Sequence, residues 1–333
     1  MATLTRNVAP GLWVRAPTRT RSLTDCAPWE LDALLEEECS HWSEVLSWDF
    51  HDVSAAVRAS LERGTLRGKL LQRDGRAVAY CYYLSDAGRT VVGSLFATRP
   101  LRDQGLEEQL LGEVLAEFGA GRGHDRVECQ TLFCTTPRAE RYFGEAGFVG
   151  RARHYLTCSL EHVPVAPPAA VRLRRVRRED LASVARVIHR SHVGSLDAAL
   201  NLTYATAAGC RAFVDMLVLR SGCGRFLAGA SQVAEDAAGR CIGVLLASRL
   251  SARNGHICQV SVLPEAQQRG TGRALVHAAL KDFARRGLKM ASLSVTVDNR
   301  PAYLLYKGLG FRLRRSFSAH ARARLPARVE LPG

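Results

Sequence analysis

The sequence predicts an α/β protein made of two similar halves, each a mixed, mostly antiparallel sheet flanked by helices. Two observations predict the repeat. The same order of helical and strand-like segments occurs twice, and matching residues recur about 165 positions apart, as Gly105 and Gly270 do. A third observation is the composition, 47% hydrophobic and 23% charged, which supplies enough apolar side chains for a core.

The length also favours two domains, since 333 residues correspond to about 150 residues for each. The segment 161–170 contains Pro164, Pro167 and Pro168 among small apolar residues. Proline stiffens a chain and removes backbone donors, so this segment is interpreted as an extended linker. We therefore expect one domain over 1–164 and a second over 165–333.

In the N-terminal half, apolar residues at helical spacing predict helices, and alternating runs between turn residues predict strands. Asp74-Gly75 is a typical hairpin turn between the first two strands. The expected helices are 28–47, 51–62, 106–120 and 137–145, and the expected strands are 70–73, 77–84, 90–97, 126–133 and 148–158.

The C-terminal half follows the same order. Glu179 and Asp180 lie in the first turn of its first helix, where they favour the helix dipole. Asn254-Gly255 is a strong hairpin signal, and we expect the turn there. The expected helices are 177–192, 206–220, 271–286 and 301–308, and the expected strands are 225–234, 240–249, 256–263, 289–297 and 311–318.

Composition excludes several classes of protein. No apolar run reaches the ~18 residues that a membrane span needs, and no secretory signal is evident. The ten cysteines form no C-x-x-C pair and mostly lie in apolar segments. We therefore expect neither a disulfide framework nor a metal site, and a reducing, cytoplasmic location. The net charge of +14 is concentrated in the second half, which points to an anionic ligand there.

A glycine-containing loop follows the strand 256–263. It has the form Gln267-x-x-Gly270-x-Gly272, and an amphipathic helix starts at once. Glycines let backbone N–H groups approach a ligand closely, and a helix N-terminus attracts anions. Arg269 and Arg273 add positive charge, so we expect a phosphate or diphosphate. The loop is neither a Walker motif nor a dinucleotide fingerprint, because Gly-Lys-Ser/Thr and G-x-G-x-x-G are absent.

A second motif follows the strand 289–297. It has the form Asn299-x-x-Ala302-x-x-x-Tyr306-x-x-x-Gly310-Phe311. The two motifs, in this order and within this strand–helix plan, resemble the GNAT family of acyl-CoA-dependent N-acyltransferases over roughly 170–318. The resemblance implies two tandem GNAT-like domains, of which the C-terminal one is an acetyltransferase that uses acetyl-CoA as cosubstrate.

The resemblance also implies a reaction and a set of contacts. The acetyl group passes directly to a primary amine of a small molecule or peptide in a ternary complex, and no cysteine near the motifs is suited to carry it. Tyr306 is the catalytic acid that protonates the departing thiolate, because a phenol with pKa ~10 is protonated at neutral pH. Backbone N–H groups near Val260–Val262 stabilise the charged oxygen, and Asn299 contacts the cofactor or caps its helix. The expected cofactor-binding residues are Val260, Ser261, Val262, Gln267, Gln268, Arg269, Gly270, Thr271, Gly272, Arg273 and Asn299.

The base that removes the amine proton stays open. Glu265 is near the end of the cofactor strand, and His256 begins that strand. His192 and Asp197 belong to a loop, 191–197, that lines the acceptor side in GNAT folds. Water is an equal candidate. The chain is expected to be a monomer or homodimer.

The N-terminal half departs from both motifs. Glu107 stands where the C-terminal loop has Gly272, and a carboxylate there repels phosphate. Thr136 and Phe143 replace the asparagine and the tyrosine. We expect this half to keep the fold without cofactor binding or chemistry. An alternative interpretation of the whole chain is a non-catalytic acyl-CoA-binding or regulatory module whose basic stretch 312–328 contacts nucleic acid, although that stretch lacks any nucleic-acid motif.

Overall fold

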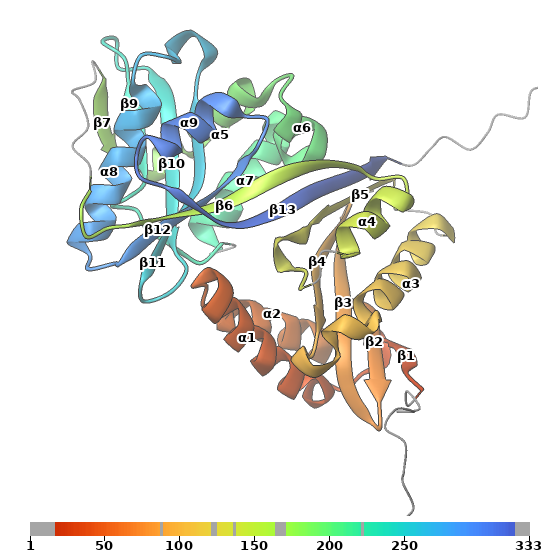
Figure 1. Cartoon of the computed structure of the whole chain (residues 1–333). Coiled ribbons are helices and arrows are strands. Elements are labelled where there is room, and N and C mark those ends of the chain that lie inside the picture. Colours follow the sequence, from red (N-terminus) through yellow and green to blue (C-terminus); the bar gives the residue numbers. More distant parts are fainter. Residues whose placement is uncertain are drawn as a thin grey trace, which may run out of the picture.

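The two halves of the chain form two lobes that share one β-sheet (Figure 1). The computed structural model describes residues 17–86, 89–120, 125–135, 138–163, 171–220 and 223–323. The expected linker and domain boundary fall largely within 164–170, outside the described residues.

Within the described residues the sheet has thirteen strands. Their order across the sheet is β1-β2-β3-β4-β5-β13-β6-β12-β11-β10-β9-β7, with β8 paired to β10. The strands are β1 (Arg19–Ser22), β2 (Arg67–Arg73), β3 (Arg76–Asp86), β4 (Arg89–Ala97), β5 (Arg126–Gln130), β6 (Val149–Ser159), β7 (Arg172–Arg175), β8 (Arg225–Phe226), β9 (Gln232–Glu235), β10 (Cys241–Arg249), β11 (Asn254–Val262), β12 (Met290–Thr296) and β13 (Arg312–Ala323).

The sheet is mixed and mostly antiparallel, as predicted. Each half contributes one parallel pair, β4 with β5 and β11 with β12. The flanking helices are α1 (Asp32–Leu46), α2 (His51–Glu62), α3 (Leu106–Ala120), α4 (Arg138–Glu145), α5 (Leu181–His192), α6 (Leu196–Leu200), α7 (Ala207–Leu219), α8 (Thr271–Arg285) and α9 (Arg300–Lys307).

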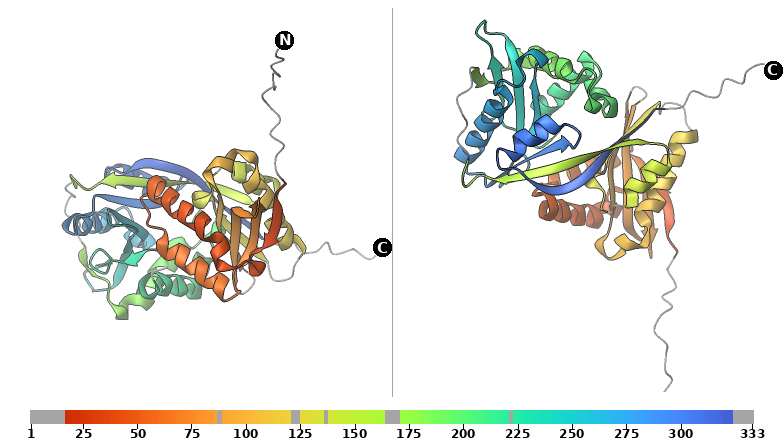
Figure 2. Two further views of the ribbon diagram at one scale, coloured as in Figure 1. Left: turned by 90° about the horizontal axis from the view of Figure 1, so that it is seen from below. Right: turned by 45° about the horizontal axis from the view of Figure 1, so that its top comes forward.

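The last strand of each half is exchanged with the other half. β6 comes from the N-terminal half but pairs with β12, and β13 comes from the C-terminal half but pairs with β5. The two long strands also pair with each other, from Arg312 opposite Thr157 to Ala321 opposite Val149. Figures 1 and 2 show them running side by side from one lobe into the other. Each lobe therefore completes its sheet with a strand of its neighbour.

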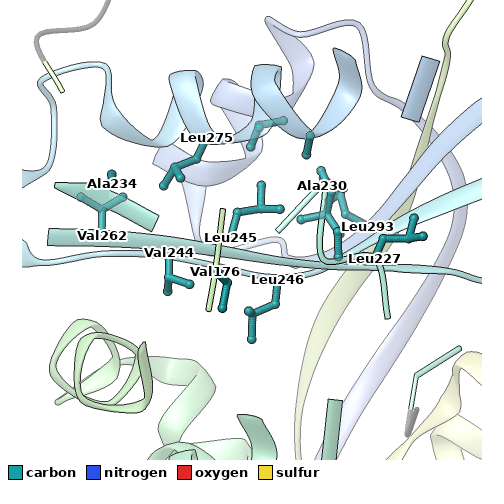
Figure 3. Close-up of a cluster of buried hydrophobic side chains, with 14 of the residues drawn as sticks. Val176, Leu227, Ala230, Ala234, Val244, Leu245, Leu246, Val262, Leu275 and Leu293 are labelled. Atoms are coloured by element: carbon teal, nitrogen blue, oxygen red, sulfur yellow. The ribbon is translucent and has the colours of Figure 1, made fainter. Parts of the chain in front are cut away.

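Helices cover both faces of the C-terminal part of the sheet. On β10, Leu245 points toward α8, whereas Val244 and Leu246 point toward the opposite face (Figure 3). α5 packs on that opposite face, with α7 against it. The alternation follows from the period-two geometry of a strand that is buried on both sides. The resulting core fixes β10 and β11, on which the site described below is built.

The expected turn at Asn254-Gly255 is wrong. Both residues belong to β11, and the chain turns at 251–253 instead. Asn254 is completely buried, and its amide donates to the Tyr155 hydroxyl at 3.2 Å. At Gly255 a Cβ would lie 2.7 Å from the Phe283 ring, so glycine is required by helix packing rather than by a turn. A dipeptide that is typical of hairpin turns therefore lies within a strand here, because tertiary contacts determine its conformation.

Other elements also differ from the prediction: the expected strand 126–133 ends at Gln130, and strands β1 and β7 were not expected. The expected loop 191–197 contains the start of α6, and the expected strand 225–234 is divided into β8 and β9. β13 continues to Ala323 beyond the expected end at 318, because its last residues pair with β5 of the other half. None of the helices in the described residues is long and apolar enough to cross a bilayer.

Candidate functional site

The parallel strands β11 and β12 separate halfway along their length. They pair from Asn254 opposite Met290 to Ile257 opposite Leu293. A β-bulge follows at Cys258, where the register with β10 shifts. Beyond it β11 pairs with β10 and β12 with β6, so the two strands diverge. Divergence leaves the inner backbone edge of Val260–Val262 facing open space.

A pocket of about 440 Å³ occupies this opening. Four segments surround it: the diverging strand β11, the following loop with the start of α8, the helix α9, and the segment between α5 and α6. The lining residues are Ser191, His192, Ser195, Asp197, Val260, Ser261, Val262, Gln267, Gln268, Gly270, Gly272, Arg273, Asn299, Pro301, Ala302, Leu305 and Tyr306.

Most of the residues expected to bind the cofactor therefore lie around one pocket. Two do not line it. Thr271 is buried, and its hydroxyl donates to the Ala266 carbonyl at 3.4 Å. Arg269 is exposed and is not among the residues that line the pocket. Their expected contacts with a cofactor stay predictions, as do the roles of the residues that line the pocket.

The loop before α8 presents backbone donors without acceptors. Gln267 ties the loop to the strand, since its side-chain amide donates to the Val262 carbonyl at 3.0 Å. Gly270 has a φ of +81°, a conformation that suits glycine. Within the described residues no hydrogen-bond acceptor faces the N–H groups from Gln268 to Arg273, and the helical ladder begins with Ala274 N to Gly270 O at 2.9 Å. Such a run of free N–H groups at a helix N-terminus is suited to an anion.

Packing within the protein does not require glycine at position 272, because a side chain there would not be crowded. A Cβ there would meet Leu305 at 3.4 Å, which is ordinary van der Waals contact. The open side of this residue is the pocket. A glycine that the fold itself does not require, placed beside free N–H groups, fits close approach of a ligand.

Tyr306 faces the pocket from α9. Asn299 caps this helix, because its side-chain oxygen accepts from Ala302 N at 3.3 Å, and it also lines the pocket. The phenol ring packs edge-on against Phe311, with 5.9 Å between the ring centres. Within the described residues the Tyr306 hydroxyl has no hydrogen-bond partner. Burial, and then the charge of Asp197, raise the pKa of Tyr306 well above its usual value, so the phenol is protonated at neutral pH.

His192 and Asp197 also line the pocket and bring ionisable groups to it. The Nδ1–H of His192 donates to the Ile188 carbonyl at 2.8 Å, so the lone pair lies on Nε2. Its ring stacks on Tyr204 with 4.2 Å between centres. Burial lowers the pKa of His192 below the ordinary 6.5, which keeps the ring neutral at physiological pH. The Asp197 carboxylate accepts from the Thr296 hydroxyl at 2.5 Å.

The other two candidate bases lie elsewhere. Glu265 is exposed and pairs with Arg190 at 3.1 Å. The backbone N–H of Glu265, and then the charge of Arg190, lower the pKa of that carboxyl. His256 is buried in the core, where burial lowers its pKa to about 4. The structure brings neither residue to the pocket.

The N-terminal half contacts the segment around α6 that lines the pocket. Glu128 on β5 is buried and accepts from Leu202 N, just after α6, at 2.8 Å. Arg89 on β4 donates to Glu128 and, at 3.0 Å, to the side chain of Asn201. These contacts hold the segment that carries Asp197 against the neighbouring lobe.

The corresponding place in the N-terminal half is filled by protein. Glu107 is completely buried and accepts from the Thr135 hydroxyl. Phe143 is completely buried, and His320 of the exchanged strand β13 stacks on it at 4.8 Å. A parallel bridge between Leu95 and Cys134 continues the contact between the strands where a cleft would open. Thr136 lies outside the described residues.

Several lining residues were not among those expected to bind the cofactor or act as base, although Ser195 lies in the expected loop 191–197 and Ala302 in the second motif. Ser195 caps α6 by accepting from Ala198 N at 3.2 Å, a helix-start signal that the sequence contained. Pro301, Ala302 and Leu305 lie on α9 beside the expected Asn299 and Tyr306. Their apolar side chains carried no signal of their own.

The pocket combines a diverging strand, a helix N-terminus whose free N–H groups suit an anion, and a buried phenol. Residues 203–311, about a third of the chain, match the sequence model of the Acetyltransferase (GNAT) family. This part of the chain is similar to that family.

Particular relatives match over short stretches. The mycothiol acetyltransferase of Nocardioides sp. is 46% identical over 57 residues, which are 17% of this chain and 19% of that protein. The mycothiol acetyltransferase of Arthrobacter sp. is 37% identical over 84 residues, 24% of this chain and 26% of that protein. The chain thus matches about a fifth to a quarter of the length of these relatives.

Solved structures are similar over almost the whole chain. A GCN5-related N-acetyltransferase from Sphaerobacter thermophilus has a TM-score of 0.66 at 18% identity and covers 92% of this chain and 95% of its own. A tandem GNAT protein from the clavulanic acid biosynthesis pathway has a TM-score of 0.60 at 16% identity, and the match covers 93% of this chain and 100% of that protein. At these identities the likeness concerns the fold, and it includes a tandem arrangement.

Proposed function

We propose that this chain is an acetyl-CoA-dependent N-acetyltransferase, in which the C-terminal half transfers the acetyl group directly to a primary amine. One observation carries the proposal. A single pocket has the free N–H groups from Gln268 to Arg273 on one side, the open edge of β11 on another, and the Tyr306 hydroxyl across from them.

The free N–H groups hold the diphosphate of CoA. Arg273 lines the pocket, with its guanidinium close to Gly308, and adds positive charge. Arg269 adds charge from the outer side of the loop. The pantetheine arm lies along Val260–Val262 and reaches Asn299, in the opening between β11 and β12. In this proposal the thioester lies at the inner end of the pocket.

The reaction forms a C–N bond and breaks the C–S bond of the thioester. The amine nitrogen attacks the thioester carbonyl carbon, and backbone N–H groups at the edge of β11 stabilise the charge on the carbonyl oxygen. As the C–S bond breaks, Tyr306 gives its proton to the departing sulfur. The pocket has no cysteine among its lining residues, which supports direct transfer.

His192 is the base that fits best. Its Nε2 carries a lone pair because Nδ1–H is held by the Ile188 carbonyl, and the ring is neutral at physiological pH. It takes the amine proton on the side opposite Tyr306. Asp197, on the same wall, favours a cationic amine as the approaching acceptor.

The acceptor is an amine of a small molecule or peptide. The test is the release of CoA thiol from acetyl-CoA with a panel of amines: aminoglycosides, polyamines, amino acids, peptide N-termini and peptide lysines. At least one class is expected to give turnover well above hydrolysis. Calorimetry with CoA is expected to give one site per chain. CoA binding without turnover on any amine would favour a non-catalytic acyl-CoA-binding module instead.

A further inference from the structure

Three potential metal ligands converge outside the acyl pocket. Cys223 precedes β8, and His256 and Cys258 lie on β11. Their ligand atoms are all within 4.8 Å of one another, and this is found among the described residues alone. The two thiols hydrogen-bond each other. Two cysteines and one histidine are a donor set that suits zinc, with thiolate and imidazole ligands. We propose that Cys223, His256 and Cys258 bind a Zn²⁺ ion.

The surroundings of His256 favour ligation through Nε2. The Ser292 hydroxyl donates to the Asn254 side-chain oxygen at 2.9 Å, which uses its single proton. The Asn254 amide is oriented by its donation to Tyr155. Ser292 must therefore accept from the Nδ1–H of His256, at 2.9 Å. Zinc-binding histidines usually donate their second ring N–H in this way, which fixes the ring and leaves Nε2 for the metal.

An ion has a route to the cluster. A cavity of about 620 Å³ reaches Cys223 and is lined also by Trp48, Asp49 and Arg249. Binding displaces the two thiol protons to solvent, and water completes the coordination of a site with three protein ligands. The Cys258 thiol also donates to the Ser248 hydroxyl at 3.2 Å and to the His256 carbonyl at 3.9 Å.

The position of the cluster defines what the ion would do. Cys258 is the bulge residue at which β11 leaves β12. The His256 ring lies between Trp48 and Tyr155 of the N-terminal half, with ring centres 5.8 and 6.1 Å away. Cys223, His256 and Cys258 do not line the acyl pocket. The zinc therefore ties the segment before β8 to the bulge and to the junction of the lobes, as a structural rather than a catalytic ion.

The first test is metal content. Protein purified with a reductant is expected to contain about one zinc per chain, and Co²⁺ substitution is expected to give the visible bands of a tetrahedral ion with thiolate charge transfer. Cys223→Ser and Cys258→Ser should each abolish the cobalt spectrum. Cys241→Ser, at another half-buried free thiol, is the matched control and should keep it.

A further variant keeps the proposal testable if the cysteine variants fail to fold. Ser292→Ala keeps all three ligands and removes the acceptor of the His256 N–H, together with the donor to the Asn254 side-chain oxygen, so zinc affinity should fall roughly 10- to 100-fold. Excess zinc should raise the thermal midpoint of the wild type by several degrees and that of Cys258→Ser not at all.

Three results would overturn the proposal. The first is wild-type protein that binds neither zinc nor cobalt while its thiols are reduced. The second is a Cys223–Cys258 disulfide, found by mass spectrometry of non-reduced peptides, in freshly purified metal-free protein. The third is equal metal loss in Cys241→Ser. These readouts do not depend on acetyl transfer, so failure of the proposed enzyme activity leaves the zinc proposal unaffected.

Discussion

The two halves of this chain have the same plan of strands and helices but differ at the place where a ligand would bind. In the C-terminal half, the parallel strands diverge and the opening is lined by free N–H groups and a phenol. In the N-terminal half, a parallel bridge, a buried carboxylate and a buried phenylalanine occupy the equivalent space. The comparison teaches that a few side chains decide whether this backbone holds a cleft or a core.

The largest effect, a loss of turnover, is expected from giving the C-terminal half the phenylalanine that the N-terminal half has at the position equivalent to Tyr306. Tyr306→Phe reproduces Phe143 and removes only the hydroxyl. Turnover should fall roughly 10²- to 10⁴-fold, the range for loss of a general acid, while CoA affinity is nearly kept. Steady-state kinetics and calorimetry measure the two separately. Tyr303→Phe, on the same helix, is the matched control and should retain activity. Unchanged turnover in Tyr306→Phe would remove this residue from the mechanism.

Giving the C-terminal half the glutamate that the N-terminal half has at the position equivalent to Gly272 should lower CoA affinity rather than turnover. Gly272→Glu reproduces Glu107 and places a negative charge beside the expected diphosphate. A like-charge pair near 4 Å costs about 1–4 kcal/mol, depending on solvent screening. CoA affinity measured by calorimetry should therefore fall at least about tenfold, and less so at high salt. Gly272→Ala separates size from charge and should lose much less. Equal losses in both variants would show that space, and not charge, distinguishes the halves.

The pH dependence of kcat/KM tests the protonation states of His192 and Tyr306. Because burial lowers the pKa of His192 below 6.5, its neutral form is lost only as the pH falls through that lowered value. The acidic limb of kcat/KM should therefore lie below pH 6.5, and the raised pKa of Tyr306 should leave activity intact up to at least pH 10. His192→Gln should reduce the rate and remove the acidic limb. An acidic limb that persists in this variant would assign the base to Asp197 or to water.

The smallest effect concerns coupling between the halves. The four tryptophans all lie in the first 48 residues, so tryptophan fluorescence reports on the N-terminal half. CoA is expected to bind the other half, yet the exchanged strands join both sheets. Saturating CoA should raise the fluorescence-detected unfolding midpoint by a few degrees, together with the midpoint from circular dichroism. A fluorescence midpoint that stays fixed while circular dichroism shifts would show that the lobes unfold separately.

Local patterns predicted most of the elements and much of the candidate pocket. Gln267, Gly270 and Gly272 belong to a short contiguous loop, and Tyr306 follows a capped helix start, so sequence spacing suffices to find them. The α/β fold with a mixed, mostly antiparallel sheet is confirmed. The division into domains at 164 and the inactivity of the N-terminal half stay predictions.

What the sequence did not predict depends on contacts between distant residues. The exchange of β6 and β13 leaves no local signature, because each strand has the same alternation whichever sheet it joins. The prediction of a turn at Asn254 is wrong because the residues that hydrogen-bond to its side chain lie far away in the sequence, on α1, β6 and β12. The cysteine spacing predicted no metal site by local rules, and that expectation stays untested; the fold brings Cys223 close to His256 and Cys258 on a strand more than thirty residues later.

The crossing of the two long strands also constrains how the protein is made. Early in translation β5 has one neighbour, β4, because its other neighbour, β13, is synthesised only after β6 to β12. β6 likewise waits for β12, which is encoded about 130 residues later. The first lobe thus emerges with an unpaired strand edge and stays a target for chaperones until β13 has been synthesised.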